Sequence, residues 1–477
     1  MNIQTLKSKL KKDTNQTYDI TYRTKIINKK RIEIIYNDSL CNSTNISDFI
    51  IRSLDKMSEY PKKINILKEI ENNIDNFKYT KIYNYKDICK YLNNGFTILI
   101  IDNYKYALAL ETKANLSRSI SLPQTEITLR GSMDSFTENI QTNIGLIRRR
   151  IKSNNLWIDT MEIGKYTKTN INIIYINDIC PPKNINLIKK RLNNININGI
   201  TNIGTIKNLI EKENKSLLPT ILSTERPDRV SQALLKGKII IMSDTTPFAL
   251  ILPISFNDLF LSTEDSYSKS INISMTRVIR YCAFFITILT PALYIAITTF
   301  NQEILPIELL ISFTKQRSTV PFPTFFEAIT MLATFEILRE CDLRLPTFTT
   351  SALSIVGALV LGEAAVNAGI VSPIMIIIIS ITVVSALLFT EPELISAIRW
   401  YRLIFMLAAN TLGIFGIVCM FSCFITKIVS LQSFNTPYFI PFSPLNTKEI
   451  KNSIIKFPVK TLIKKKGVTN EKNNYSN

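Results

Sequence analysis

Hydrophobic positions change their pattern near residue 275. Before that point, short apolar runs alternate with polar segments rich in Lys, Asn and Glu, which is typical of water-soluble structure. After it come long apolar stretches, among them 282–299 and 372–389. A helix needs roughly 20 apolar residues to cross the hydrocarbon core of a membrane. The pattern predicts a soluble head followed by a polytopic helical transmembrane bundle.

Two segments of the head share one pattern. In the first, Gly95 precedes an apolar run that ends at Asp102, and in the second, Gly237 precedes an apolar run that ends at Asp244. An Ala-Leu pair follows each Asp at the same spacing. Each copy predicts a short helix that ends at Gly, a strand, an Asp-led turn and a second strand. We therefore expect an internal duplication, with one supersecondary unit used twice.

These patterns divide the chain into six predicted parts. The predicted fold class is α+β in the head, made of two small α/β subdomains, and α-helical in the membrane. The parts are a poorly ordered basic arm at 1–44, the first α/β subdomain at 45–120, a connecting amphipathic helix region at 121–154, the second α/β subdomain at 155–270, a transmembrane bundle of four to six membrane segments at 275–428 and a basic cytosolic tail at 429–477.

Three consecutive arginines, Arg148, Arg149 and Arg150, end the connecting helix. Ile140 and Ile144 lie on its apolar face, so the helix is amphipathic and cationic. Its basic residues could form a solvated face, contact anionic lipid or meet acidic residues of a neighbouring subunit. Arg forms planar bidentate pairs with carboxylates and replaces the Lys used elsewhere in the head. This choice favours a subunit interface over a lipid contact.

Small residues recur along the predicted membrane helix at 348–369. Small side chains spaced by four residues let two helix backbones approach closely. The candidate pore or helix-packing residues are Gly357, Ala358, Gly362, Glu363, Ala365 and Gly369. A charge such as that of Glu363 is costly in lipid. Three readings stay open for Glu363: a helix end at the interface, a water-lined passage through a homo-oligomer, or a buried pair with Arg339 or Arg344.

Four full crossings would place both chain ends in the cytoplasm. The predicted crossings are 275–299, 348–369, 372–389 and 403–424, and 304–313 is too short to cross. Lys315, Arg317, Arg339 and Arg344 would then lie in an external loop, against the positive-inside trend. The predicted number of membrane segments therefore stays between four and six.

Composition removes several functional classes. The formal charge is +19 but is scattered through the head and gathered again in the tail, so no nucleic-acid partner is predicted. There is no histidine, and the seven cysteines are dispersed without a Cys-x-x-Cys pair. No nucleophile motif or phosphate-binding loop is found either. We predict no catalytic residues, no metal, no cofactor and no enzymatic activity.

An ordered set of motifs resembles the A subunit of the nutrient germinant receptors of spore-forming bacteria (GerA type). Three positions depart from the family pattern: Ser132 stands where the family usually has Pro, Thr245 where it usually has Gly, and Glu363 where many relatives carry an uncharged residue. The motifs that carry the resemblance are Thr128–Gly131, Phe136–Glu138, Asn143–Arg150, Ile163–Gly164, Thr224–Pro227, Asp244–Phe248, Leu343–Pro346 and Gly362–Pro373.

The resemblance implies a function and partners. It implies a nutrient-sensing subunit in the spore inner membrane, with a transporter-like B subunit and a lipoprotein C subunit as partners. The expected function is an oligomeric ion channel that opens in response to germinant and releases ions. Head and tail are expected in the cytoplasm, in contact with membrane lipids. The alternative is a non-conducting scaffold that couples the head to a transporting partner.

Overall fold

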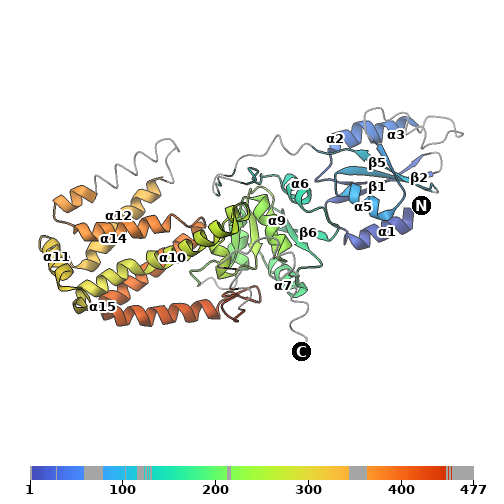
Figure 1. Ribbon diagram of the computed structural model, residues 1–477. Coiled ribbons are helices and arrows are strands. Elements are labelled where there is room, and N and C mark those ends of the chain that lie inside the picture. Colours follow the sequence, from blue (N-terminus) through green and yellow to red (C-terminus); the bar gives the residue numbers. More distant parts are fainter. Residues whose placement is uncertain are drawn as a thin grey trace.

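The computed structural model describes most of the chain (Figure 1). The described residues are 3–27, 30–57, 79–102, 104–114, 131–211, 216–342, 362–446 and the single positions 123, 126, 128, 450 and 453. The head lies at the right of Figure 1 and a bundle of long helices at the left. The second half of the head joins them.

The first half of the head is a five-stranded antiparallel sheet with helices on both faces. The spatial order is β1-β2-β4-β5-β3, with Ile32 paired to Ile101 and Ile98 paired to Ala109. Buried apolar residues of the sheet pack against helices on each side, which gives three layers. Its elements are α1 (Ile3–Asp13), β1 (Ile20–Ile27), β2 (Lys30–Asn37), α2 (Ser43–Asn45), η1 (Ile46–Ile51), α3 (Arg52–Met57), β3 (Tyr79–Ile82), α5 (Tyr85–Leu92), β4 (Phe96–Ile101) and β5 (Ala107–Glu111).

The second half of the head repeats this arrangement. Its strand order is β6-β7-β9-β10-β8, again antiparallel throughout. One face of the sheet packs against α6 and α9, and the other against α7 and α8. Its elements are α6 (Ile140–Arg150), β6 (Leu156–Ile163), β7 (Thr169–Ile176), α7 (Pro182–Asn193), α8 (Ile203–Ile210), β8 (Leu222–Thr224), α9 (Pro227–Leu235), β9 (Ile239–Ser243) and β10 (Ala249–Leu252).

The equivalent strand orders confirm the predicted duplication. Gly95 and Gly237 precede β4 and β9, and both have φ of +79°. This left-handed conformation favours glycine because a side chain there meets its own backbone. At Gly237 an added Cβ would also lie 3.1 Å from the carbonyl oxygen of Ile179. The repeated Gly therefore marks the same helix-to-strand turn in both copies.

The duplicated unit is longer than the sequence pattern indicates. Residues 1–44 were expected to form a poorly ordered arm, but α1, β1 and β2 belong to the first sheet and its layers. The edge strand β1 exposes Arg23 and Thr24, so its polar composition hides its place in the fold. Likewise, α6 falls within the predicted connecting region but packs in the second subdomain through Ile140, Ile144 and Ile147.

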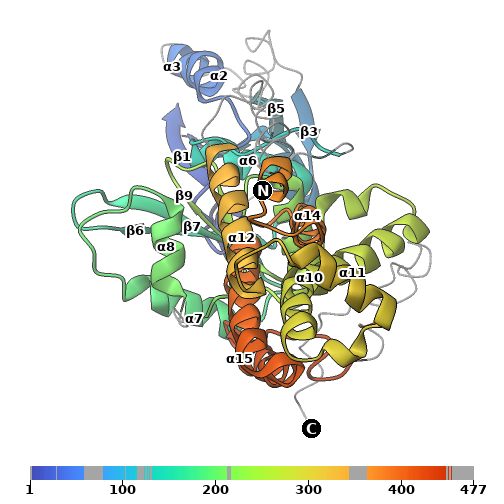
Figure 2. The same cartoon turned by 90° about the vertical axis from the view of Figure 1, so that its left-hand side faces the viewer.

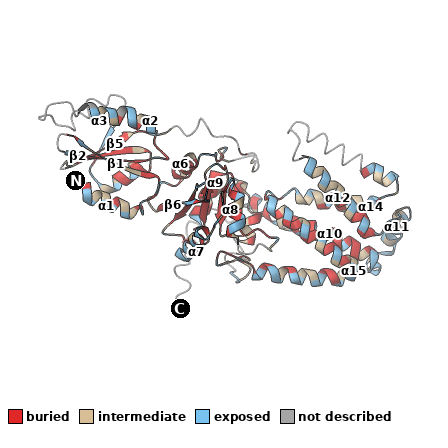
Figure 3. Ribbon diagram, turned by 180° about the vertical axis from the view of Figure 1, so that it is seen from behind, coloured by how far each residue is buried: buried red, intermediate tan, exposed pale blue. Residues whose placement is uncertain are grey.

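Long helices follow the second sheet. Figure 2 shows α10, α12, α14 and α15 from the end remote from the head. Buried residues continue without a break from the second sheet into these helices, because both contribute to one hydrophobic core (Figure 3). The elements are η2 (Phe256–Phe260), η3 (Thr263–Ser266), α10 (Ser270–Thr299), η4 (Gln302–Ile304), α11 (Ile307–Arg317), α12 (Thr324–Asp342), α14 (Pro373–Ala386) and α15 (Pro392–Ser430).

The element α15 is two antiparallel helices joined at Gly413. The rings of Tyr401 and Phe424 lie 4.7 Å apart, whereas an unbroken helix would separate them by about 35 Å. Gly413 interrupts the helix with φ +61° and ψ −141°. The single crossing predicted at 403–424 is therefore wrong, because the chain reverses in its middle. The apolar run gives no signal of this turn apart from Gly413 and Gly416.

Both ends of α15 lie beside the head, and its turn lies at the remote end of the bundle. Asn301, which follows α10, accepts a hydrogen bond from Ile414 N through Oδ1 at 3.3 Å. Phe389, which follows α14, contacts the rings of Phe260 and Phe284 beside the head. In the part of the chain that the structure describes, α10 and α15 are long and apolar enough to cross a membrane, and α14 is a shorter apolar helix.

Candidate functional site

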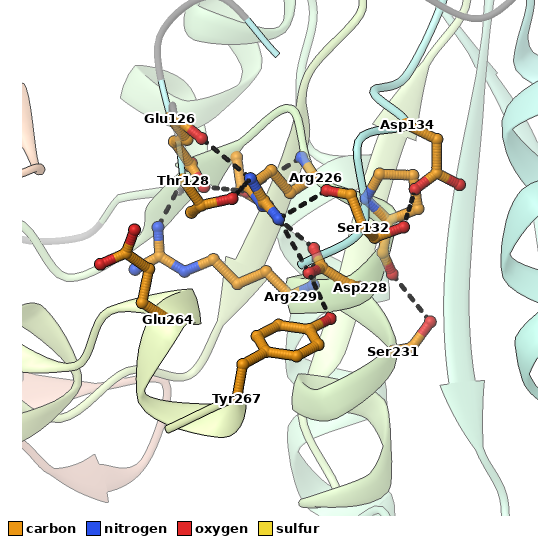
Figure 4. Close-up of polar contacts among 12 residues, drawn as sticks. Glu126, Thr128, Ser132, Asp134, Arg226, Asp228, Arg229, Ser231, Glu264 and Tyr267 are labelled. Carbon is orange, nitrogen blue, oxygen red and sulfur yellow. Dashed lines mark hydrogen bonds and ion pairs between the residues drawn. The ribbon is translucent and has the colours of Figure 1, made fainter. Parts of the chain in front are cut away.

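Arg226 lies at the centre of a buried polar cluster at the start of α9 (Figure 4). Its side chain is 1% exposed. Nε and Nη2 donate to the carboxylate of Asp228 at 3.1 and 3.0 Å. Nη1 donates to Thr128 Oγ1 at 2.8 Å and to Glu126 O at 2.9 Å, and Nη2 donates to Ser132 O at 2.9 Å. The planar guanidinium thus fastens the segment around 126–132 to α9.

Two sequence motifs that lie far apart in the chain meet in this cluster. Thr224 Oγ1 donates to Glu126 Oε2 at 3.0 Å and accepts from Arg226 N at 3.2 Å. Gly131 has φ of +145°, and a Cβ there would lie 2.9 Å from Cε2 of Tyr267. These residues shape the fold, as the sequence indicates, because the polar groups of the cluster form hydrogen bonds that position the chain.

Arg229, one turn along α9, joins the head to the bundle. Its Nη1 lies 3.2 Å from Glu126 Oε1 and 2.5 Å from Glu391 Oε1, and all three side chains are largely buried. Glu391 directly precedes α15. Burial raises the pKa of the Glu126 carboxyl, and Arg229 offsets this only in part. One guanidinium therefore pairs with two desolvated carboxyl groups, one on each side of the boundary.

A second ion pair crosses the same boundary. Lys207 of α8 pairs with Glu393 in the first turn of α15, and the Lys207 side chain is 7% exposed. The carboxylate also lies at the positive end of the helix dipole. Two separate elements of the second subdomain thus hold the start of α15.

The base of α10 is held in the same way. Asp265 pairs with Arg277 at 3.0 Å and with Arg280 at 3.1 Å. In η2, which leads into α10, Asp258 pairs with Lys238 at 2.7 Å. Burial raises the pKa of Asp258, but the ammonium of Lys238 outweighs it and leaves the pKa below its ordinary value. Charge pairing therefore fixes the chain where the head ends and the bundle begins.

The chain after α15 returns to the head. Tyr438 Oη donates to Pro219 O at 2.7 Å, and Ser433 Oγ donates to Thr220 O at 2.7 Å. Between them lies a small hairpin of β11 (Gln432–Ser433) and β12 (Thr436–Pro437). We call the following set of residues, which make polar contacts between head and bundle, the junction: Lys207, Arg229, Glu391, Glu393, Asp265, Arg277, Arg280, Ser433 and Tyr438.

The three predicted interface arginines have different places. Arg148 is buried, and its Nε and Nη2 donate to Asp19 at 2.8 and 3.0 Å. It ties the two subdomains of one chain together, so its prediction as a subunit contact is wrong. Arg150 pairs with Asp134 at 2.6 Å within the same chain. Arg149 is exposed, and its subunit contact stays a prediction.

Four of the six predicted pore or packing residues are described, and Gly357 and Ala358 lie outside the described residues. Gly362 begins the described part of its helix, Glu363 is exposed, and Ala365 packs at the edge of the main core. Gly369, at φ +66°, instead ends the helix: its N–H bonds to Val366 O, and the next N–H bonds to Ala365 O. This is a Schellman cap, so the turn that ends the helix explains a glycine at position 369 without any role in helix packing.

Sequence reasoning did not identify the junction. Arg229, Lys207, Glu391 and Glu393 read as ordinary surface charges because their partners come from distant parts of the chain. The only local signal is Glu391-Pro392, an acid and a proline that together begin a helix. Among the described residues, no group of three or more His, Cys, Asp or Glu could hold a metal ion, and the cysteines are free.

The fold and the junction define a class of protein: a duplicated α/β head fastened by buried ion pairs to an apolar helical bundle. A family model described as "Bacillus/Clostridium GerA spore germination protein" matches residues 8–468. The chain belongs to this GerA family.

Two individual relatives agree with this assignment. The chain is 42% identical to spore germination protein KA of Bacillus subtilis (strain 168), over 76% of this chain and 67% of that protein. It is 35% identical to spore germination protein B1 of the same organism, over 94% and 93%. A solved structure, the N-terminal domain of the A subunit of the Bacillus megaterium spore germinant receptor GerK3, is 32% identical with a TM-score of 0.42 and covers 54% of this chain and 97% of that one.

Proposed function

We propose that the chain is the A subunit of a nutrient germinant receptor and forms an oligomeric ion channel in the spore inner membrane. Its partners are a transporter-like B subunit and a lipoprotein C subunit. The observation that carries this proposal is the junction, because a head held to membrane helices by buried charges can bias their arrangement. A ligand shifts such an equilibrium only through different affinities for its two states.

The proposed topology places head and tail in the cytoplasm. The helix α10 and the first half of α15 run away from the head, while α14 and the second half of α15 run back. The first half of α15, residues 392–412, is about 31 Å long, close to the hydrocarbon thickness. Arg339 lies beside Arg399 and Arg402 near the head side, which supports a cytoplasmic place for it in this topology. This placement removes part of the conflict with the positive-inside trend.

The link between Arg229 and Glu391 provides a test of coupling between head and bundle. Arg229→Met and Glu391→Gln should each destabilise the full chain, and the double variant should lose less than their sum. The expected interaction energy is about 0.5 to 3 kcal/mol, because the two groups neutralise each other in a desolvated place. Thermal unfolding in detergent measures it, and germination assays at equal protein level should show a slower response. Additive effects with unchanged germination would contradict the coupling role.

A matched control exists for the charge removed from Glu391. Glu303 is exposed and lies in η4 at the remote end of the bundle. Glu303→Gln should leave both stability and germination as in the wild type. If it slowed germination as much as Glu391→Gln, the effect would come from total charge and not from the junction.

Gly362 provides a test of packing between copies. Gly362 is buried, and among the described residues a Cβ built there meets nothing closer than Ile376 Cδ1, at 3.9 Å, so these residues present no clash at Cβ. Gly362→Leu should therefore leave the folded chain stable but change its contacts with neighbouring copies. We expect altered germination or ion leak at a normal protein level. Wild-type behaviour in both assays would remove Gly362 from the proposed packing face, and Ile377→Leu serves as a control on an exposed position of α14.

A further inference from the structure

Three arginines converge on one carboxylate where α12 and α15 meet. Glu336 of α12 lies 3.3 Å from Arg339, 3.2 Å from Arg399 and 3.3 Å from Arg402. Arg399 and Arg402 belong to the first half of α15. Glu340 is the second acid within electrostatic reach of Arg399. Among the described residues, three guanidinium groups thus face two carboxylates, which leaves an excess of positive charge.

The three arginines have more N–H donors than the hydrogen bonds between the described residues use. Each guanidinium has five N–H donors. Arg399 donates to Glu336 and to Ser396 Oγ, but its buried Nε has no hydrogen-bond partner among the described residues. The side chains of Arg339 and Arg399 are 34% and 35% exposed. As far as the described residues show, the exposed parts of Arg339 and Arg399 are therefore open to an anion from outside the chain.

Exposed apolar residues lie next to the cluster residues along both helices. Ile337 of α12 and Trp400 and Leu403 of α15 are 65%, 58% and 41% exposed. Arg399 lies about 10 Å along α15 from the end beside the head. Tryptophan at this depth is typical of the boundary between headgroups and acyl chains. A ligand that fits has an anionic group for the arginines and hydrocarbon for their neighbours.

We propose that Arg339, Arg399 and Arg402 bind the phosphate of an anionic phospholipid in the leaflet next to the head. Arg forms bidentate charge-assisted hydrogen bonds with phosphate oxygens, and the acyl chains lie along Ile337 and Leu403. Glu336 orients the three guanidinium groups and competes with the phosphate for their donors. This inference rests on the proposed membrane position of the bundle, but not on ion conduction.

The test uses the full chain in nanodiscs, with insertion measured separately. Phosphatidylglycerol or phosphatidylcholine is titrated into neutral nanodiscs, and bound lipid is counted by mass spectrometry. Arg339→Gln together with Arg399→Gln should weaken phosphatidylglycerol binding about 30-fold, at about fivefold for each arginine. Glu336→Gln should strengthen it, because the competing carboxylate is gone. Lys315→Gln, a cation at the remote end of the bundle, should bind as the wild type does.

Each other result overturns the assignment. Displacement of the lipid by millimolar inorganic phosphate would identify free phosphate as the ligand. Unchanged binding in the double arginine variant, or weaker binding in Glu336→Gln, would leave the cluster as a tie between helices only. The double variant is also tested for binding to the B subunit. If it binds phosphatidylglycerol as the wild type does but no longer binds the B subunit, the site is assigned to an acidic protein segment. Failure of the chain to insert would contradict the proposed membrane position of the bundle. Because insertion is measured separately, this result is distinguishable from a failure of lipid binding.

Discussion

Gly413→Ala is expected to prevent the chain from accumulating as a folded membrane protein. At φ +61° and ψ −141°, the backbone is in a region that only glycine adopts readily. A Cβ would lie 2.9 Å from Asn301 Oδ1 and 2.9 Å from Phe300 Cβ. Strain and overpacking together should cost about 2 to 6 kcal/mol, which is comparable with the whole stability of many domains. The measurements are membrane protein level and thermal unfolding in detergent.

Neighbouring positions make this prediction specific. A Cβ at Gly416 would lie 2.2 Å from Ala408 O across the same turn, so Gly416→Ala should be equally damaging. Gly362→Ala is the matched control, because among the described residues its Cβ meets nothing closer than 3.9 Å. Normal accumulation and unfolding temperature in Gly413→Ala would show that 392–430 does not reverse at this residue.

Arg226→Ala should have the second large effect, on the head. It leaves Asp228 buried without its main partner and frees the oxygens of Glu126, Thr128 and Ser132. Breaking a buried pair by removing one partner costs about 3 to 5 kcal/mol. Arg226→Lys should recover little of this, because an ammonium cannot reach the same set of acceptors in one plane.

The two tryptophans allow this effect to be located. Trp157 lies in β6 of the head and Trp400 in α15, so a Trp400→Phe background reports head unfolding through Trp157 alone. Arg149→Ala, at an exposed position of α6, is the control and should unfold as the wild type does. Equal unfolding temperatures for Arg226→Ala and Arg149→Ala would contradict the role of Arg226 in holding the segment around 126–132.

The sequence predicts the local parts of this fold well. The spacing from Gly to Asp to Ala identifies the second hairpin of each subdomain, because buried strands and glycine turns leave local patterns. It does not reveal that α1, β1 and β2 belong to the first copy, since the edge strand β1 carries charges on its exposed positions. The departure at Thr245 is informative in retrospect: its φ is +70°, a conformation that suits the Gly that the family resemblance implies there.

Long-range pairing explains what the sequence does not predict. Arg148 reads as a surface charge on an amphipathic helix, yet its partner Asp19 comes from the other subdomain. Arg229 and Glu391 likewise meet only after the second sheet and the bundle have packed together. The reversal at Gly413 is hidden because the apolar run of 403–424 continues across it without a charged residue. In each case, segments that are distant in the sequence come into contact, and no local sequence pattern indicates this contact.

Single-channel recording of the purified chain in planar bilayers is the most direct test of the proposed channel. The account predicts discrete openings in bilayers that contain inserted protein, with their frequency changed by Gly362→Leu. Bilayers that hold verified, inserted protein together with its B and C partners, and that remain silent for the wild type and for Gly362→Leu, would contradict conduction and leave a scaffold that couples the head to a transporting partner.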